Sequence, residues 1–302
     1  MKRLLPLLVI ALAGCPEAAK PPPSAAASAF DGERAFALLK ELCLIGPRNH
    51  GSLEKEKAEA WIAERMKACG AEVTVHEFRH LPKRATGESK FRNIVAKLRP
   101  GESKRVLLGT HYDTRSWADK DPDPSVRMDP IVGANDGGSG VAVMIALAEA
   151  WKTAPPAFGV DMIFFDGEDF GREGEWDDYF LGSTAWVRDF PGYKVEWGVI
   201  LDMVGDAKLT IRKEQASVDG APQVVERLWA AAGRAGAKSF LDQKQPEMMD
   251  DHRAFLKNGL PVALLIDFEY PFFHTDEDTP DRCSAESLGQ VGRTLFEAMR
   301  AR

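Results

Sequence analysis

The chain has 302 residues, of which 44% are hydrophobic and 28% charged, which is enough for one large globular domain with a sizeable core. Its net charge is −7 and its isoelectric point about 5.5, so it lacks the basic balance that is typical of a nucleic-acid-binding protein. An acidic balance is ordinary for a globular protein and indicates no particular partner.

The N-terminal segment has the composition of an export signal followed by a linker. Two basic residues precede an apolar run at residues 4–13, which is too short to span a bilayer and is typical of a signal peptide. The Leu-Ala-Gly-Cys sequence ending at Cys15 resembles the bacterial lipobox, in which the cysteine is lipidated and becomes the mature N-terminus. An ordinary signal peptide with a chance cysteine is the alternative.

These features predict where the protein is found. We expect residues 1–15 to be a lipoprotein signal with lipidation at Cys15, and residues 16–30 to be a tether rich in Pro and Ala. The protein would then be an exported, membrane-anchored bacterial lipoprotein that faces the periplasm or the cell surface. It would contact the membrane through its lipid only.

Helical and strand patterns alternate through the rest of the chain. Periodic apolar residues with capping residues predict helices, and short apolar runs predict buried strands. The expected helices are 31–44, 52–69, 138–151, 182–188, 222–233 and 285–301, and the expected strands are 72–78, 93–98, 105–109, 160–165, 199–203, 209–212 and 262–266. The alternation indicates one doubly wound α/β domain over residues 31–302, with a mostly parallel central sheet and helices on both faces.

Two features remain open within this pattern. The loop at 113–132 is long and rich in Asp and Pro, and its position between two candidate ligand turns favours a functional role. Of the cysteines beyond the lipobox, Cys43 and Cys69 could form a disulfide in an exported protein. Both fall on apolar faces of expected helices, however, so buried free thiols are equally consistent, as for Cys283.

Side chains that can bind a metal occur just after the apolar strands or in the turns that follow them. They are His111, Asp136, Asp169, Asp202 and His274. Each alone has an ordinary interpretation, such as a turn-forming aspartate or a hydrogen-bonded histidine. Their joint occurrence at comparable strand ends favours one site, and imidazole with carboxylate is a ligand set typical of Zn²⁺.

Acidic neighbours extend this candidate site. Glu168 is adjacent to Asp169, and two adjacent residues do not both point comfortably at one metal, so Glu168 would face the substrate as a general acid and base. Asp113 is well placed to accept a hydrogen bond from a ligand histidine. We assign Asp251 and His252 to the same supporting layer.

Six spaced motifs carry a resemblance to a known family. In chain order they are Gly-Thr-His-Tyr-Asp, Asn-Asp-Gly-Gly-Ser-Gly, Asp-Gly-Glu-Asp, Leu-Asp-Met-Val-Gly, Asp-Asp-His and His-Thr-Asp-Glu-Asp-Thr. Together they resemble the exported zinc aminopeptidase and glutaminyl cyclase superfamily over most of the expected domain. The resemblance implies that Asp136, Asp169 and His274 bind the zinc that both branches hold, and that His111 and Asp202 match the ligands of a second metal in the aminopeptidases.

The resemblance also implies roles in catalysis. Glu168 matches the proton-shuttling glutamate of the superfamily. Asp250 matches an acidic residue that the cyclases use beside the reacting amide, where Asp202 would assist it. The loop from Phe170 to Leu181 looks like the longer loop of the cyclases, whereas aminopeptidases usually reach the following Leu-Gly-Ser sooner.

Aromatic residues are expected to shape the substrate pocket. Phe273 precedes the last ligand histidine at a position where cyclases commonly have Trp. Its ring keeps a surface for a small substrate side chain but lacks the indole N–H. Trp176 and Tyr270 are assigned to the same pocket.

We therefore expect a zinc-dependent glutaminyl-peptide cyclotransferase. Such an enzyme would hold one zinc ion, convert the N-terminal Gln of peptides or proteins to pyroglutamate with release of ammonia, and act as a monomer. The alternative is an aminopeptidase with two zinc ions, and a more remote one is an inactive binding domain on the same fold. Both enzymatic hypotheses require a free peptide N-terminus.

Overall fold

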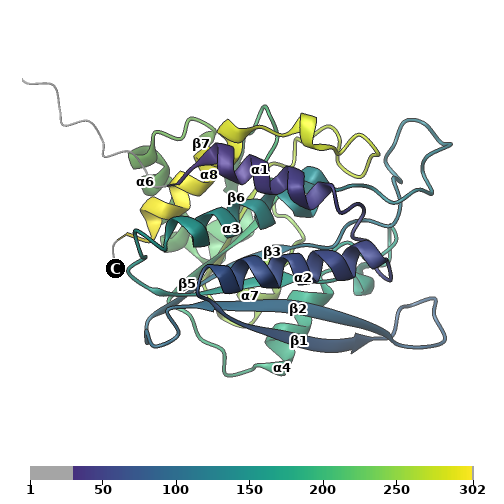
Figure 1. Ribbon diagram of the computed structural model, residues 1–302, viewed down its shortest axis with the longest axis horizontal. Helices are drawn as coiled ribbons and strands as arrows, with labels where there is room; N and C mark the ends of the chain where they lie inside the picture. Colours follow the sequence, from purple (N-terminus) through teal and green to yellow (C-terminus); the bar gives the residue numbers. More distant parts are fainter. Residues whose placement is uncertain (1–29, 301–302) are drawn as a thin grey trace, which may run out of the picture.

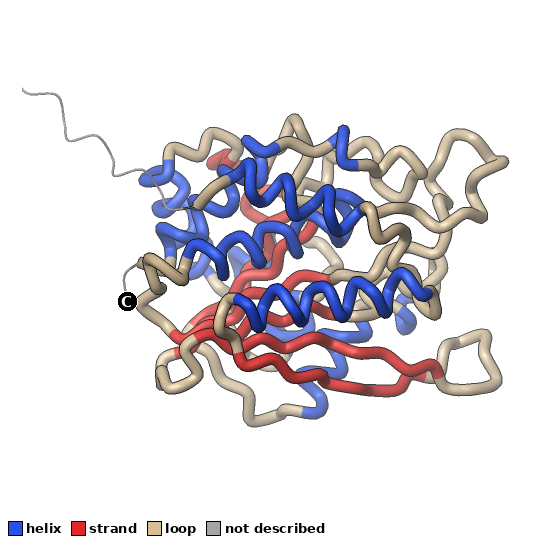
Figure 2. Tube along the Cα trace, viewed as in Figure 1, coloured by secondary structure: helices blue, strands red, loops and turns tan. Residues whose placement is uncertain are grey.

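A central six-stranded sheet organises the computed structural model, which describes residues 30–300 (Figures 1 and 2). The sheet order is β1-β2-β4-β3-β5-β8, and β3, β4, β5 and β8 run parallel, whereas β2 is antiparallel to both β1 and β4. The bounds are β1 (Glu72–His80), β2 (Ser89–Leu98), β3 (Arg105–His111), β4 (Gly159–Phe165), β5 (Trp197–Asp202) and β8 (Val262–Ile266). The mostly parallel α/β sheet expected from the sequence is confirmed.

Helices cover both faces of the sheet. Five of them share the larger hydrophobic core. The five are α1 (Gly32–Cys43), α2 (Leu53–Ala68), α3 (Gly140–Ala150), α6 (Pro222–Ala235) and α8 (Ala285–Ala298). Of these, α1, α2 and α3 lie in front of the sheet in Figure 1. The second core lies on the opposite face, beneath α4 (Leu181–Asp189) and α7 (His252–Lys257). Along β3, Val106 and Leu108 enter the first core and Leu107 the second, because successive strand residues point to opposite faces.

Several short elements complete the domain. β6 (Ile211–Glu214) and β7 (Phe240–Gln245) form a small parallel pair, and α5 (Gln215–Gly220) follows β6 directly. The interrupted helical turn η1 (Ala134–Ser139) precedes α3, and the short helices η2 (Trp176–Asp178) and η3 (Pro280–Arg282) lie in loops. The sequence analysis missed α5, α7 and β7. β7 is largely exposed and polar, and the two helices have only six residues each, too few for a clear apolar period.

The remaining sequence predictions have mixed outcomes. The signal peptide, Cys15 and nearly all of the tether lie outside the described residues, so those predictions stay as they were. Cys43, Cys69 and Cys283 are free thiols, so the Cys43–Cys69 disulfide does not form in this structure. Within residues 30–300, no helix combines the length and apolar character needed to cross a membrane.

Candidate metal centre

The predicted ligands reach one place because the strands that precede them are parallel. His111 and Asp202 are the last residues of β3 and β5, and Asp169 lies in the turn after β4. Asp136 lies in η1, after the long loop from β3, and His274 lies in the loop after β8. The carboxyl ends of parallel strands share one edge of a sheet, where ligand sites of open α/β sheets form. All five side chains are buried there.

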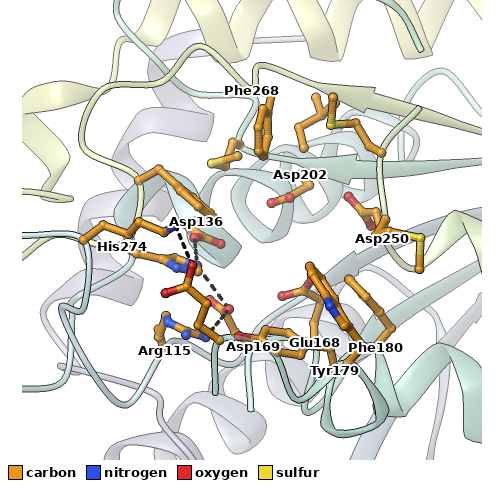
Figure 3. A pocket seen from close by; sticks show the side chains of 18 of the residues that line it. Arg115, Asp136, Glu168, Asp169, Tyr179, Phe180, Asp202, Asp250, Phe268 and His274 are labelled. Carbon is orange, nitrogen blue, oxygen red and sulfur yellow. Dashed lines mark hydrogen bonds and ion pairs between the residues drawn. The ribbon is translucent and has the colours of Figure 1, made fainter. Parts of the chain in front are cut away.

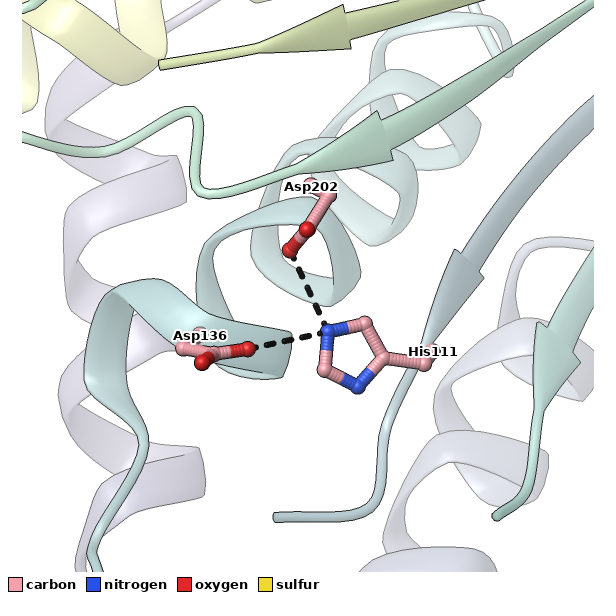
Figure 4. A group of neighbouring side chains, drawn as sticks. All are labelled: His111, Asp136 and Asp202. Carbon is pink, nitrogen blue, oxygen red and sulfur yellow. Dashed lines mark hydrogen bonds and ion pairs between the residues drawn. The ribbon is translucent and has the colours of Figure 1, made fainter. Parts of the chain in front are cut away.

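The ligands form two groups of three that share Asp136. In the first group, His111 Nε2 lies 3.2 Å from Asp136 Oδ1 and 3.2 Å from Asp202 Oδ1 (Figure 4). In the second, His274 Nε2 lies 3.4 Å from Asp136 Oδ2 and 3.2 Å from Asp169 Oδ1 (Figure 3). The ligand atoms of each group all lie within 4.8 Å of one another. Asp136 therefore offers one carboxylate oxygen to each group, as a bridging ligand does.

This donor set fits a divalent cation. Asp136 Oδ2 and Asp169 Oδ2 are buried, and neither accepts a hydrogen bond from residues 30–300. Burial raises the pKa of Asp136, and the nearby Asp169 carboxylate raises it further. A cation would offset both effects by stabilising the ionised carboxylate. Histidine nitrogens with carboxylate oxygens beside a pocket are the ligands that catalytic zinc sites use.

A buried carboxylate outside the ligand set holds the turn that carries Asp136. The backbone N–H groups of Asn135 and Asp136 donate to Asp278 Oδ1 and Oδ2 at 2.8 and 3.0 Å. Gly137 follows with φ 76°, and a Cβ there would lie 2.7 Å from the backbone oxygen of Asp113, so the turn requires glycine. The sequence analysis missed Asp278, although it belongs to the last of the six motifs.

The assignment of Tyr270 to the substrate pocket was wrong. Its hydroxyl donates to Asp278 Oδ1 at 2.7 Å, and its side chain is buried in the second hydrophobic core. Tyr270 therefore supports the Asp136 turn from behind. A buried tyrosine needs a partner for its hydroxyl, but the sequence alone does not show that this partner is Asp278.

The turn after β4 presents Glu168 to the pocket. Gly167 begins the turn with φ 73°. Asp113 then accepts hydrogen bonds from the backbone N–H groups of Glu168 and Asp169, at 3.2 Å each. Asp113 Oδ1 also lies 3.7 Å from His111 Nδ1, and Glu168 Oε2 lies 3.8 Å from the same nitrogen. Asp113 thus lies behind His111 and the Glu168 turn and holds that turn through its backbone N–H groups. The hydrogen bond from a ligand histidine that the sequence analysis expected is not made, because His111 Nδ1 has no hydrogen-bond partner within residues 30–300.

Glu168 has the electrostatic setting of a group that exchanges protons. Its carboxyl belongs to neither group of ligands, yet it lines the same pocket. Burial raises its pKa well above the ordinary value, and the carboxylates of Asp169 and Asp202 raise it further. A cation at the adjacent ligands would lower this pKa again, because it stabilises the ionised carboxylate.

The pocket itself is a cavity of about 410 Å³ over these ligands, a size typical of small-ligand sites. Trp176 and Phe273 line it, as expected, and the Phe273 ring stacks on His274 with the ring centroids 3.6 Å apart. Tyr179, Phe180 and Phe268 also line the pocket and were not singled out from the sequence. The first two belong to the loop that the resemblance had marked, and this loop was the available signal.

The three residues of the motif Asp250-Asp251-His252 face different parts of the structure at the start of α7. Asp250 lines the pocket, and burial, together with Asp202 and Asp251, raises its pKa well above the ordinary value. Asp251 is buried behind it, and burial raises the pKa of Asp251 to about 7. His252 faces Glu214 instead, with Nε2 3.3 Å from Glu214 Oε2, and none of its described contacts is with a predicted ligand. Its assignment to the supporting layer of the metal ligands was therefore wrong.

The sequence model of peptidase family M28 matches residues 93–299, which is more than half of the chain. The chain belongs to peptidase family M28. A glutaminyl-peptide cyclotransferase-like protein from Mus musculus is 25% identical over 239 residues, which cover 69% of this chain and 60% of the mouse protein. The chain thus spans about three fifths of the length of that relative.

Solved structures resemble this M28 chain over nearly all of their length. The glutaminyl cyclase of Bacteroides thetaiotaomicron, bound to N-acetylhistamine, is 33% identical with a TM-score of 0.86, and the match covers 90% of this chain and 98% of that one. A Zn-dependent exopeptidase from Parabacteroides distasonis is 32% identical with a TM-score of 0.86, covering 90% and 99%. The superfamily expected from the sequence is confirmed, and zinc is the metal that its two groups of ligands suit.

Proposed function

We propose that this chain is a zinc-dependent glutaminyl-peptide cyclotransferase, which converts an N-terminal Gln to pyroglutamate and releases ammonia. The observation that carries the proposal is the position of Asp250. Its buried carboxyl lies across the pocket from His274 and Asp169, with Glu168 between the two sides (Figure 3). A primary amide needs this arrangement, because its oxygen requires an electrophile and its NH₂ group requires acceptors on the other side.

Each of these residues would have a separate role in the reaction. Zinc held by Asp136, Asp169 and His274 would act as a Lewis acid on the side-chain carbonyl of the substrate. Asp250, with Asp202 beside it, would accept hydrogen bonds from the amide NH₂ and fix its orientation. Because the attacking amine and the amide belong to one residue, this orientation contributes much of the acceleration.

Glu168 would move the proton. It accepts a proton from the α-amine as the amine nitrogen bonds to the side-chain carbonyl carbon. It then delivers this proton to the amide nitrogen as the old carbon–nitrogen bond breaks, and ammonia leaves. The proton that Glu168 takes up is the proton that it returns, so the carboxylate is regenerated in each cycle.

A di-zinc aminopeptidase is the second candidate, and the bridging position of Asp136 favours it. The group of His111, Asp136 and Asp202 suits a second zinc ion, and one of the similar structures is a Zn-dependent exopeptidase. Glu168 would then be the base for an attacking water. An inactive binding domain is the least supported candidate, because all five ligands and Glu168 are present. Glu168 and four of the ligands line one pocket, and His111 lies against two of those four.

Two measurements on the purified protein separate these candidates. Zinc per chain is counted by elemental analysis, and Gln-peptides are compared with aminoacyl anilides as substrates. One zinc per chain with release of ammonia from Gln-peptides supports the cyclase. Two zinc ions with cleavage of anilides, and no ammonia, would refute it in favour of the aminopeptidase.

Asp250→Asn is expected to lower kcat/KM for a Gln-peptide. The variant keeps the shape of the side chain but turns part of it into a donor that opposes the substrate NH₂. A hydrogen bond to a charged group contributes about 1.5–3 kcal/mol, which corresponds to a loss of roughly 10–100-fold. The loss in kcat/KM is measured as steady-state ammonia release. Asp242→Asn is the control, because Asp242 is exposed on β7. Equal kcat/KM for both variants would contradict the role of Asp250.

We also propose that the enzyme is an exported lipoprotein held at the membrane through Cys15. The lipobox-like sequence before Cys15 supports this proposal. Cys15→Ser is expected to move the protein from the membrane fraction to the soluble fraction of cells that express it. An unchanged distribution would argue against lipidation at this residue. The substrates would be N-termini of peptides or proteins outside the cytoplasm.

A further inference from the structure

An ion pair between a buried arginine and a half-buried aspartate lies at the start of the long loop between β3 and η1. Arg115 Nε donates to Asp119 Oδ1 at 2.9 Å, and Arg115 Nη2 donates to Asp119 Oδ2 at 2.6 Å. The arginine side chain is only 1% exposed and that of the aspartate 29%. Two parallel hydrogen bonds of this kind form a rigid pair with defined geometry. None of the roles assigned above uses either residue.

Each member of this pair lies against a different predicted zinc ligand. Arg115 Nη1 donates to Asp169 Oδ1 at 3.3 Å and to the backbone oxygen of Gly171 at 3.0 Å. Asp119 Oδ1 lies 3.6 Å from His274 Nδ1. That nitrogen is buried and makes no hydrogen bond within residues 30–300. The pair therefore connects the turn after β4 with the loop after β8.

The same loop also holds the backbone at His274. His274 has φ 57°, a left-handed conformation that is uncommon for a residue other than glycine. The backbone N–H of Lys120 donates to the His274 carbonyl oxygen at 3.1 Å. Asp121 Oδ2 accepts from the backbone N–H of Asp276 at 3.1 Å. The loop thus contacts the His274 turn through main chain and side chains together.

We propose that Arg115 and Asp119 are positioning residues that set the zinc affinity of the group Asp136, Asp169 and His274. A carboxylate that faces Nδ1, here at 3.6 Å, favours the imidazole tautomer with its proton on Nδ1, which leaves the Nε2 lone pair free for the metal and makes the ring a stronger ligand. Arg115 donates to Asp169 Oδ1 and so holds this ligand in place, and it balances the charge of the half-buried Asp119.

The effect is specific to one of the two groups of ligands. The contacts described for Arg115 and Asp119 include Asp169 and His274 but neither His111 nor Asp202. The inference rests on the assignment of the His274 group to zinc, but it holds for a cyclase and an aminopeptidase alike. It also gives the loop a role that the sequence analysis could only suspect.

Zinc affinity of the full-length protein tests this proposal. Asp119→Asn keeps the size of the side chain but removes its charge, and loss of such a supporting carboxylate is expected to weaken zinc binding about 10–100-fold. The dissociation constant is measured by competition with a chelator of known affinity. Asp129→Asn is the matched control, because Asp129 is an exposed aspartate of the same loop, and its zinc affinity should stay at the wild-type value. An unchanged dissociation constant for Asp119→Asn would overturn the proposal.

Two further variants keep this test decisive. Arg115→Lys retains the charge but loses the double hydrogen bond, so it should also bind zinc more weakly, by more than the loss of stability of the metal-free protein accounts for. If the free energy of unfolding of the metal-free variant fell by as much as the free energy of zinc binding, the role of Arg115 would be purely structural. His274→Ala should lose the site. If His274→Ala kept full zinc affinity, the metal assignment itself would fail. If His274→Ala lost zinc affinity and Asp119→Asn did not, only the positioning role would be refuted.

Discussion

Replacing Glu168 by glutamine is expected to lower kcat by about 10²–10⁴-fold, which is the usual contribution of a positioned general acid and base. Zinc content should not change, because the Glu168 carboxyl belongs to neither group of ligands. The turn should also persist, since Asp113 holds it through the backbone N–H of residue 168 rather than through the side chain. Ammonia release under saturating Gln-peptide and elemental analysis of the same sample measure the two quantities.

The matched control for this variant is Glu226→Gln. Glu226 is an exposed glutamate on α6. Its replacement by glutamine removes the same charge at a position away from the pocket. Full turnover by Glu168→Gln would show that another group moves the proton. A fall in turnover accompanied by loss of zinc would mean that Glu168 is a ligand and not the proton carrier.

Replacing Lys55 by methionine is expected to lower the free energy of unfolding by about 3–5 kcal/mol, the usual effect of breaking a buried ion pair. Lys55 Nζ lies 2.7 Å from Asp166 Oδ2 and 2.8 Å from Glu59 Oε1, and the side chains of Lys55 and Asp166 are only 7% and 1% exposed. Burial raises the pKa of Asp166 to about 7 even though Lys55 lowers it. Asp166 immediately precedes the turn that carries Glu168, so this ion pair lies beside that turn.

Chemical denaturation measures this loss, with Lys57→Met as the comparison. Lys57 lies on the same helix, and its side chain is 62% exposed. Its Nζ lies 3.5 Å from Glu54 Oε1, and an exposed ion pair of this kind contributes at most about 1 kcal/mol. The double variant Lys55→Met with Asp166→Asn should recover part of the stability, because it removes the buried charge that Lys55 had compensated. If Lys55→Met were no more costly than Lys57→Met, the buried pair would contribute little to the fold.

The strands and the ligands could be predicted because both depend on local sequence. β8 was predicted with the bounds that it has, since an apolar run between turn residues indicates a buried strand. His111 and Asp202 were found because a polar residue at the end of such a run must emerge at the sheet edge. The same logic located Glu168 and Asp169 after β4.

The supporting contacts could not be predicted, because each depends on how the loops that carry the two partners fold. Nothing near Tyr270 indicates that its hydroxyl donates to Asp278 while Asp278 holds the Asp136 turn. The acidic motif at Asp250 was recognised, but it lies where a loop passes into α7, and the sequence does not show which of its residues faces the pocket. Only the three-dimensional structure separates Asp250, in the pocket, from His252, against Glu214.

The bridging position of Asp136 has a consequence for how the chain unfolds. A metal at the His274 group joins η1 to the loop after β8, and the segment between Asp136 and His274 is almost half of the chain. Such an ion acts as a reversible cross-link that closes a long loop and reduces the conformational entropy of the unfolded chain. The tolerance of this enzyme to heat should therefore vary with the concentration of free zinc around it. For the exported location proposed above, that concentration would be set by the surroundings and not by the cell that made the protein.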